Sequence, residues 1–366
     1  MAEPPPPPQQ VRFGIMGCAT IARKVARAIM LAPNATIVAI GSRSLEKAVS
    51  FAKENGFPAT AKVYGSYDAV LDDEEVDAVY IPLPTSLHVE WAVRAAQKKK
   101  HVLLEKPVAL NVKELDAILA ACESSGVQFM DGTMWMHHPR TARMKEVLSD
   151  PQQLGQIKTI HSAFSFAGGP EFLKNDIRTK PDLDSLGALG DLGWYCIRAI
   201  LWAFDYELPK SVTAIADPEV NDSGVILSCG ASLKWQEGGR TATFYCSFLT
   251  TMVMDLTVLG TNGNLHANDY VIPVNENDAT FYMNRINRIA NYAYSLGNPA
   301  REETIATDLP QEALMIKEFC DLVGGIQGNG ANPEKKWGEI STKTQVVLDA
   351  VKASIDNGFK PVEVVY

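Results

Sequence analysis

The sequence predicts an α/β domain followed by an α+β domain whose sheet is mainly antiparallel and open. The first observation is length, because 366 residues exceed what one small domain usually contains. The second is a regular alternation of short apolar runs and amphipathic stretches up to residue 131. The third is a change of rhythm after residue 139, where longer segments of alternating hydrophobicity take over. Two domains of different architecture therefore follow one another along the chain.

The first domain is expected to be a parallel, doubly wound sheet. Short apolar strands separated by amphipathic helices are typical of that arrangement, since helices then cover both faces of the sheet. A ligand of such a domain lies at the carboxyl ends of the strands. The predicted strands are residues 11–16, 37–41, 78–82, 101–104 and 128–131, and the predicted helices are 21–31, 44–55, 85–99 and 111–124.

The second domain is expected to bind substrate or to mediate dimerisation through a broad sheet. Turn residues at 237–239 and 261–264 separate its strands, which favours antiparallel pairing. The predicted strands are residues 157–166, 211–216, 225–235, 241–249 and 254–259, followed by helices at 310–323 and 339–357. The boundaries are a tail at 1–10, a first domain at 11–135 and a second at 136–366. The last helix, at about 339–357, could pack back on the first domain.

Composition and charge exclude several classes of function. A net charge of −9 argues against binding to nucleic acid or to an anionic membrane surface. No apolar run approaches the ~20 residues that a membrane-spanning helix needs. The expected partners are therefore a small-molecule substrate and a second copy of the chain, since a homodimer is the default for a broad antiparallel sheet face.

The N-terminal residues and the cysteines are also informative. Residues 1–10 contain five consecutive prolines, which favour a solvated, disordered tail, with a docking motif for a proline-binding partner as the alternative. The six cysteines stand singly among mostly apolar neighbours and form no C-x-x-C. Reduced thiols and a cytoplasmic location are expected.

A glycine-containing loop follows the first strand, in the order Gly14-Ile15-Met16-Gly17-Cys18-Ala19-Thr20-Ile21-Ala22. A Rossmann turn needs a first glycine for the tight bend, a second for approach to the pyrophosphate and a third small residue for helix packing. Gly17 and Ala22 satisfy the first and third needs, whereas Ala19 stands at the second. A structural turn is the alternative for so imperfect a motif. The predicted phosphate loop is Gly17, Cys18, Ala19, Thr20 and Ile21.

The end of the second strand predicts NADP(H) as the cofactor. An NAD site usually carries an acid about 20 residues after the glycines, to bind the ribose hydroxyls. Here Ser42 and Arg43 follow Gly41, and no acid precedes Glu46. A guanidinium and a hydroxyl suit a 2′-phosphate. The alternative is that Arg43 is a solvated loop residue and Ser44 a helix N-cap.

Two further motifs carry a resemblance to a known family. One is Glu105-Lys106-Pro107, after the strand 101–104, and the other is Gly187-Ala188-Leu189-Gly190-Asp191-Leu192-Gly193-Trp194-Tyr195. Together with the glycine loop and residues 81–88, they resemble the glucose–fructose oxidoreductase/inositol dehydrogenase/MocA (Gfo/Idh/MocA) family. The resemblance covers nearly the whole chain after the tail. Tyr195 points to the dimeric dihydrodiol dehydrogenase branch, because many other members carry His there.

The resemblance implies a catalytic set of Lys106, Tyr195 and Asp191. Hydride transfer to or from a carbinol carbon needs a group that exchanges the hydroxyl proton. A free tyrosine, with a pKa near ~10, is a poor base at neutral pH, so a neighbouring lysine would have to favour its ionised form. Asp191 and Tyr195 are four residues apart and therefore share a helix face. The hypothesis makes Tyr195 the proton donor and acceptor and Lys106 its electrostatic partner. Asp191 then orients Lys106 or the substrate hydroxyl. In the alternative, Tyr195 is an ordinary core aromatic.

The loop Leu83-Pro84-Thr85 with His88 matches the family segment that passes the nicotinamide ribose. His88 could equally be a satisfied histidine within a helix. Glu105 either contacts the cofactor or fixes its own loop. These residues complete the predicted cofactor site.

Substrate contacts are the least determined part of the sequence. Trp135 and His137 could line the pocket, although His137 replaces an arginine that the family often has, which weakens transfer from relatives. Arg178 and Asn175 could reach substrate, or they could be solvated loop residues. No zinc site is expected at His137 and His138, because adjacent side chains point apart and no third ligand is evident.

Three functions fit these residues. The favoured one is an NADP(H)-dependent oxidoreductase that interconverts a secondary alcohol and a carbonyl on a sugar, cyclic polyol or dihydrodiol. The second keeps and recycles its cofactor, with isomerisation or elimination as the outcome. The third is a non-catalytic NADP-sensing protein, which the presence of Lys106, Asp191 and Tyr195 disfavours. The sequence leaves the substrate unidentified.

Overall fold

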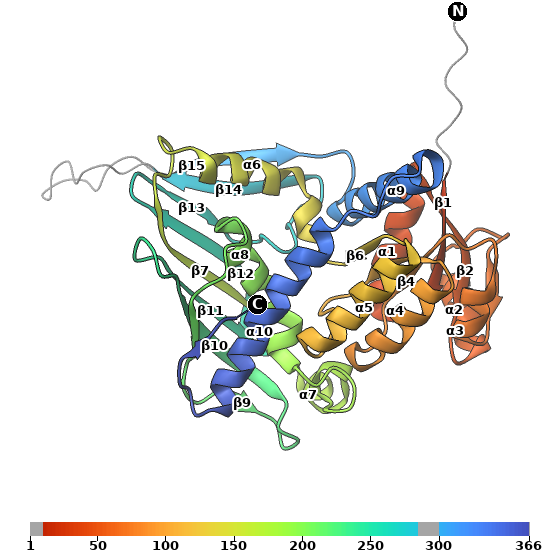
Figure 1. Cartoon of the computed structure of the whole chain (residues 1–366), viewed down its shortest axis with the longest axis horizontal. Coiled ribbons are helices and arrows are strands. Elements are labelled where there is room, and N and C mark those ends of the chain that lie inside the picture. The colour runs from red at the N-terminus through yellow and green to blue at the C-terminus, as the bar shows by residue number, and fades with distance from the viewer. Residues whose placement is uncertain (1–9, 285–299, 366) are drawn as a thin grey trace, which may run out of the picture. The chain divides into compact units, whose positions relative to one another are not determined.

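The computed structural model describes residues 10–284 and 300–365 and divides the chain into two compact units (Figure 1). The first unit takes residues 1–108, 114–137 and 309–338, and the second takes 109–113, 138–308 and 339–366. The crossing near residue 137 lies close to the predicted domain boundary. The predicted proline-rich tail lies outside the described residues, apart from Gln10.

The first unit is built on a six-stranded sheet in which every adjacent pair is parallel. Its strand order, β3-β2-β1-β4-β5-β6, is that of a Rossmann fold. The strands are β1 (Val11–Met16), β2 (Ala35–Gly41), β3 (Lys62–Tyr64), β4 (Ala78–Ile81), β5 (His101–Leu104) and β6 (Phe129–Asp131). The helices are α1 (Thr20–Leu31), α2 (Leu45–Glu54), α3 (Tyr67–Asp72), α4 (His88–Gln97) and α5 (Val112–Ser125), with η1 (Thr85–Leu87) and η2 (Met134–His137) as short 3-10 turns.

A helix from late in the sequence completes the first unit. Helix α9 (Gln311–Asn329) packs on α1, and its Phe319 ring lies 5.8 Å from that of Phe13 on β1. Its buried face is mostly apolar. Helix α9 therefore packs against β1 and β2 in the same way as helices that lie between the strands in sequence. Of α10 (Lys336–Asp356), residues 339–356 group with the second unit. Helix α9 thus groups with the first unit, while the packing of the last helix on the first domain stays a prediction.

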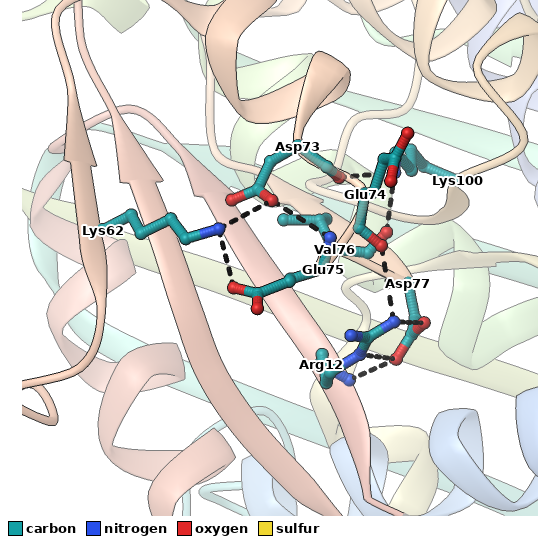
Figure 2. A network of polar contacts seen from close by, with 8 residues as sticks. All are labelled: Arg12, Lys62, Asp73, Glu74, Glu75, Val76, Asp77 and Lys100. Carbon is teal, nitrogen blue, oxygen red and sulfur yellow. Dashed lines mark hydrogen bonds and ion pairs between the residues drawn. The ribbon is translucent and has the colours of Figure 1, made fainter.

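Ion pairs and hydrogen bonds link residues at the amino ends of the first-unit strands (Figure 2). Arg12 on β1 binds Asp77, which precedes β4, with Nη2–Oδ1 at 2.8 Å. The buried Lys100, before β5, donates to the carbonyls of Asp73 and Val76 at 2.8 and 2.7 Å. These contacts satisfy the polar groups at this edge, while the ligand edge is the opposite one, at the carboxyl ends.

The second unit is built on a ten-stranded sheet in the order β15-β14-β13-β12-β7-β11-β10-β8-β16, with β9 beside β10. One neighbouring pair, β7 with β11, is parallel and the others are antiparallel. The predicted mainly antiparallel sheet is thus confirmed. The strands are β7 (Ile157–Ala167), β8 (Ser211–Ala214), β9 (Glu219–Val220), β10 (Ile226–Lys234), β11 (Thr241–Ser247), β12 (Leu249–Gly260), β13 (Asn264–Ala267), β14 (Asp278–Asn284), β15 (Arg301–Ala306) and β16 (Val362–Glu363).

Helix α8 (Trp194–Ala203) lies on this sheet against β7 and β11 (Figure 1). Every residue of α8 is buried, as its almost continuous apolar sequence requires. Helices α6 (Pro139–Ser149) and α7 (Pro170–Asn175) and the 3-10 turn η3 (Ile177–Thr179) complete the second unit with α10. Among the described residues, no helix is both long and apolar enough to cross a membrane.

Candidate active site

The loop after β1 has the backbone of a phosphate-binding turn. Gly17 adopts φ +123°, and a Cβ at this position would meet Leu83 Cδ2 at 3.1 Å, so glycine is needed here. Ala19 is the N-cap of α1 with φ −71° and ψ 157°, an ordinary extended conformation, and its side chain forms no cap. The first amide groups of α1 are thus left without a side-chain cap, which suits an anionic ligand.

The loop after β2 gathers hydroxyl and cationic groups. Ser42 is buried and accepts from the Ser44 N–H at 3.3 Å, while Ser44 caps α2 by accepting from Lys47 N–H at 3.3 Å. Arg43 is exposed and hydrogen-bonds the phenol of Tyr67; burial raises the pKa of Tyr67, and the charge of Arg43 opposes that rise. Ser44 is thus a helix cap, as the alternative held, while Arg43 has a defined partner.

Lys47 is a cofactor-site candidate that sequence reasoning missed. Burial raises the pKa of the Cys18 thiol, whereas a hydrogen bond with Ser42 and the nearby Lys47 ammonium lower it. Lys47 therefore lies near the phosphate loop. A lysine in the first turn of a helix is electrostatically unfavourable unless an anion offsets it, and this could have drawn attention to it.

His88 is a buried connector. Its Nε2 lies 2.8 Å from the Leu83 carbonyl and its Nδ1 lies 3.2 Å from the Val108 carbonyl. A neutral imidazole donates to one of these two carbonyls, and the ring lies between the loop after β4, with Leu83, Pro84 and the buried Thr85, and the segment after β5. This geometry favours the alternative in which His88 is a buried, hydrogen-bonded histidine. It would then support the loop after β4 without contacting the cofactor.

Glu105 is held inside the loop that carries Lys106. Its Oε1 accepts from the Tyr80 hydroxyl at 2.6 Å, and its Oε2 accepts from the Lys106 N–H at 3.2 Å. The Lys106–Pro107 peptide bond is cis. Of the two predicted roles for Glu105, fixing the loop is the one these contacts support.

The predicted cofactor residues form a row along one edge of the first-unit sheet. Arg43 follows β2, Gly17 follows β1, Leu83 follows β4 and Lys106 follows β5, and these four strands are neighbours in that order. Adjacent strands are about 4.8 Å apart, so the row is long enough for an extended dinucleotide. Such a ligand would have its 2′-phosphate end at β2 and its nicotinamide end at Lys106.

In the second unit, Asp191 is paired with Arg178. Asp191 Oδ2 lies 3.0 Å from Arg178 Nε, and Asp176 Oδ1 lies 3.1 Å from Arg178 Nη1. The pKa of the Arg178 guanidinium is raised, chiefly by the charge of Asp191. The structure thus joins two residues that the sequence had placed in unrelated roles.

Tyr195 is the second residue of α8, which directly follows a π-helical turn, η4 (Leu189–Gly193). The predicted helix start near Gly190 is therefore a π turn, a local widening that recurs at functional sites. Gly187 precedes it with φ +57°, where a Cβ would lie 2.1 Å from the Ile226 carbonyl. The Tyr195 ring is 5% exposed and packs at 5.6 Å on Phe164.

The predicted pocket residues Trp135 and His137 have buried side chains. Trp135 is fully buried, and the His137 side chain is 1% exposed. His137 Nδ1 lies 2.9 Å from Glu318 Oε2, and its ring stacks at 4.7 Å on Trp337. These contacts favour a packing role for both residues over a direct substrate contact.

No group of three or more His, Cys, Asp or Glu side chains in residues 10–284 and 300–365 is arranged to hold a metal ion. His138 instead caps α6 by accepting from the Arg140 N–H at 2.9 Å. All six cysteines are free thiols.

Sequence comparison agrees with this arrangement. Residues 11–133 match a family described as an oxidoreductase family with an NAD-binding Rossmann fold, and residues 141–266 match the GFO/IDH/MocA C-terminal domain. The fold and the row of cofactor residues define a dinucleotide-dependent oxidoreductase. The chain belongs to the GFO/IDH/MocA family of these enzymes.

Relatives with named activities span sugar and dihydrodiol chemistry. The chain is similar to D-xylose 1-dehydrogenase (NADP(+)) 2 of Haloferax volcanii, at 36% identity over 70% of this chain and 75% of the relative. It is similar to trans-1,2-dihydrobenzene-1,2-diol dehydrogenase of Danio rerio, at 29% identity over 70% and 73%. A solved 3-ketoreductase from Actinomadura kijaniata, in complex with NADP and TDP-benzene, matches with TM-score 0.80 and 28% identity over 94% and 98%. The predicted family is confirmed, and its relatives include both the dihydrodiol dehydrogenases and sugar-modifying reductases.

Proposed function

We propose that the chain transfers hydride between NADP(H) and a carbon that alternates between secondary alcohol and ketone, on a sugar, a cyclic polyol or a dihydrodiol. The observation that carries this proposal is the row of cofactor residues along the carboxyl edge of the first-unit sheet, which ends at Lys106. The relatives named above act, by their names, on xylose and on a dihydrodiol.

The residues after β2 fit NADP(H) better than NAD(H). Ser42, Arg43 and Lys47 offer a hydroxyl and two cations at the adenosine end, and no acid stands between Gly41 and Glu46. One relative carries NADP(+) in its name, and the matched ketoreductase is a complex with NADP. The cofactor supplies or accepts the hydride, and the chain's own residues bind it and manage the proton.

The proposed roles follow the family resemblance. Tyr195 exchanges the proton of the substrate oxygen, and Lys106 favours negative charge on that oxygen. Asp191 orients Lys106 or the substrate hydroxyl. Solved structures that match this chain include variants of the ketoreductase in which a tyrosine or a lysine was replaced. These variants support the proposal that a tyrosine and a lysine take part in the reaction.

A turnover screen tests this proposal. Purified protein is assayed with sugars, inositols and dihydrodiols in the presence of NADP+, and with ketoses and enones in the presence of NADPH, with NADH in parallel. Turnover of at least one alcohol–ketone pair, with preference for NADP(H), is expected. A cofactor that copurifies and never exchanges would instead indicate the recycling alternative, and tight NADPH binding without turnover would indicate the sensing alternative.

Self-association through the sheet of the second unit is the proposed quaternary arrangement. Tyr245 on β11 and Met252 on β12 are 39% and 60% exposed, and His161 on β7 lies beside Thr243 of β11 at 2.6 Å. Large side chains exposed on a broad sheet suit a twofold contact. Light scattering should show a dimer whose dissociation is promoted by Tyr245→Glu, and an unchanged mass for that variant would argue against this face.

A further inference from the structure

Arg178 lies between two carboxylates in the second unit. Its Nε is 3.0 Å from Asp191, and its Nη1 is 3.1 Å from Asp176. The three side chains are 32%, 13% and 27% exposed, so Asp191 is the most enclosed of them. Two of the three guanidinium nitrogens are thereby used within the protein, which leaves little of Arg178 for a ligand.

Asp176 fixes the direction in which Arg178 points. Its Oδ1 caps η3 by accepting from the Arg178 backbone N–H at 3.0 Å, and the same oxygen accepts from Nη1. A planar guanidinium held at both ends loses little further entropy when it binds a second carboxylate. Asp176 therefore presents the Nε edge of Arg178 to Asp191.

The charge of Asp191 can influence proton loss from Tyr195, because the two residues are four positions apart along the helix. Asp191 lies in the π turn η4 and Tyr195 in the first turn of α8, four residues later on a continuous helix. An ionised carboxylate alone at that place would disfavour negative charge on the Tyr195 oxygen. A carboxylate paired with a guanidinium has a much weaker field at the same distance, because the two charges oppose each other.

Several titratable groups packed around this helix are neutral, whereas the buried Arg198 on α8 is a cation that donates to Thr344 at 2.7 Å and to Ser341 at 3.5 Å. Tyr270 hydrogen-bonds Ser162 on β7 at 3.1 Å, and burial raises its pKa well above the ordinary value. Burial likewise raises the pKa of Cys196 on α8 to about 12 and that of Cys246 on β11 well above its usual range. The charges that these contacts place near η4 are therefore those of Asp176, Arg178, Asp191 and Arg198, and Arg198 is the same in every variant compared below.

We propose that Arg178 is a positioning residue that acts on the reaction through Asp191, and that it is not a ligand of the substrate. It holds the Asp191 carboxylate in place and offsets its charge, so that Tyr195 can give up its proton at lower pH. This inference rests on the proposed proton role of Tyr195.

The pH dependence of alcohol oxidation tests the inference. With NADP+ saturating, kcat should rise with pH along a limb that reports proton loss from the catalytic tyrosine. In Arg178→Gln, loss of the guanidinium charge beside Asp191 should move this limb upward by about one pH unit. Below the limb kcat then falls roughly tenfold, while the plateau at high pH and KM stay near the wild-type values. Arg178→Lys keeps the charge and should show a smaller shift.

Arg143→Gln is the matched control. Arg143 is 33% exposed and pairs with Glu146 and Glu303, at 2.7 and 2.5 Å, on α6 and β15. Its loss removes a comparable ion pair of the same unit and should leave the limb unmoved. In an Asp191→Asn background, Arg178→Gln removes only the direct field of the guanidinium, so the shift should be smaller than in the wild type, where the held carboxylate is also released.

Each other outcome overturns the inference. A raised KM with an unmoved limb would make Arg178 a substrate ligand. An equal loss of kcat at every pH, with a lower melting temperature, would make it a structural residue. A shift of undiminished size in the Asp191→Asn background would mean that Arg178 does not act through Asp191. A limb that survives Tyr195→Phe would instead count against the proposed function itself.

Discussion

The two units hold their functional residues by different means. In the first unit the cofactor residues are placed by backbone, at Gly17, and by side chains bound to main-chain groups, as His88 is to the carbonyls of Leu83 and Val108. In the second unit the candidate catalytic residues depend on side-chain pairs, Asp191 with Arg178 and Tyr195 with Phe164.

This contrast matters for substitution as well as for function. A loop built from backbone tolerates change in the side chains that it carries, provided that its dihedral angles stay accessible. A site built from side-chain charges responds to every substitution of a partner, because an enclosed carboxylate left alone is costly. We therefore expect substitutions in the first unit, apart from those of Lys106, to affect mainly cofactor binding and those in the second to affect mainly turnover and its pH dependence.

The largest expected effect is loss of turnover in Tyr195→Phe. Removing the proton-exchanging hydroxyl should lower kcat about 10³-fold while the affinity for NADPH stays within about twofold. Steady-state kinetics and a fluorescence titration with NADPH measure the two quantities. A parallel Tyr282→Phe change on β14 provides the control for loss of a phenol in the same unit.

Tyr195→His sharpens this test. Many members of the family carry histidine at this place, so the variant should regain part of the activity that Tyr195→Phe loses. Near-normal turnover in Tyr195→Phe would remove the proposed role, and the contrast between a binding unit and a catalytic unit would then lose its strongest support.

Acid sensitivity should be shared by the two units, because each carries a buried histidine with a lowered pKa. Burial lowers the pKa of His101 and that of His138 to about 4 from 6.5, and each Nδ1 accepts a backbone N–H, from Gln128 and Arg140, at 2.9 Å. The folded pKa lies below the unfolded one, so this stabilisation is present above pH 6.5 and is lost as the pH falls toward 4. Each histidine should cost about 2 kcal/mol of unfolding free energy between pH 7 and pH 5.

Asparagine substitutions separate the two contributions. His101→Asn and His138→Asn keep an acceptor for the backbone N–H but cannot take up the proton. Urea titrations at pH 7 and pH 5 should show a smaller loss of stability in each variant than in the wild type. An unchanged loss in one variant would show that its histidine takes up its proton as readily in the folded protein as in the unfolded one.

The fold was predictable where the strands are apolar and failed where they are short or polar. All five strands predicted for the first domain are present, since buried parallel strands are continuous apolar runs. The missed strand β3 has only three residues, none of them buried. Strand β15, with the sequence REETIA, is an exposed edge whose charges hide it from a search for apolar runs.

The candidate site was predictable to the extent that it is local in sequence. Gly17 and Ser42 are recognisable because their roles depend on a few neighbouring residues. The pairing of Asp191 with Arg178 joins η4 to η3, and no local sequence pattern predicts it. His137 was expected at a pocket because of its neighbours, whereas its actual partners are Glu318 on α9 and Trp337 on α10. These residues follow His137 by 181 and 200 positions, so only folding brings them close.

A more modest effect is expected at the adenosine end of the cofactor. Arg43→Ala should weaken NADPH binding roughly tenfold, by loss of a charge-assisted contact of about 1.5 kcal/mol, and leave NADH binding unchanged. Lys47→Ala should weaken NADPH binding less, because it is expected to act as a nearby point charge. Lys53→Ala, at the opposite end of the same helix and exposed, is the matched control. Equal losses for NADPH and NADH in Arg43→Ala would show that Arg43 does not read the 2′-phosphate.

The smallest effect should come from restoring the missing glycine of the phosphate loop. Ala19 departs from the usual motif, yet its φ of −71° and ψ of 157° are accessible to any residue, and Gly17 supplies the positive φ that the turn requires. Glycine and alanine differ little at an N-cap that uses no side-chain bond. Ala19→Gly should therefore change NADPH affinity by less than about twofold and leave the melting temperature nearly unaltered. A large gain in affinity would show instead that the methyl group crowds the pyrophosphate and that this loop, like the second unit, depends on its side chains.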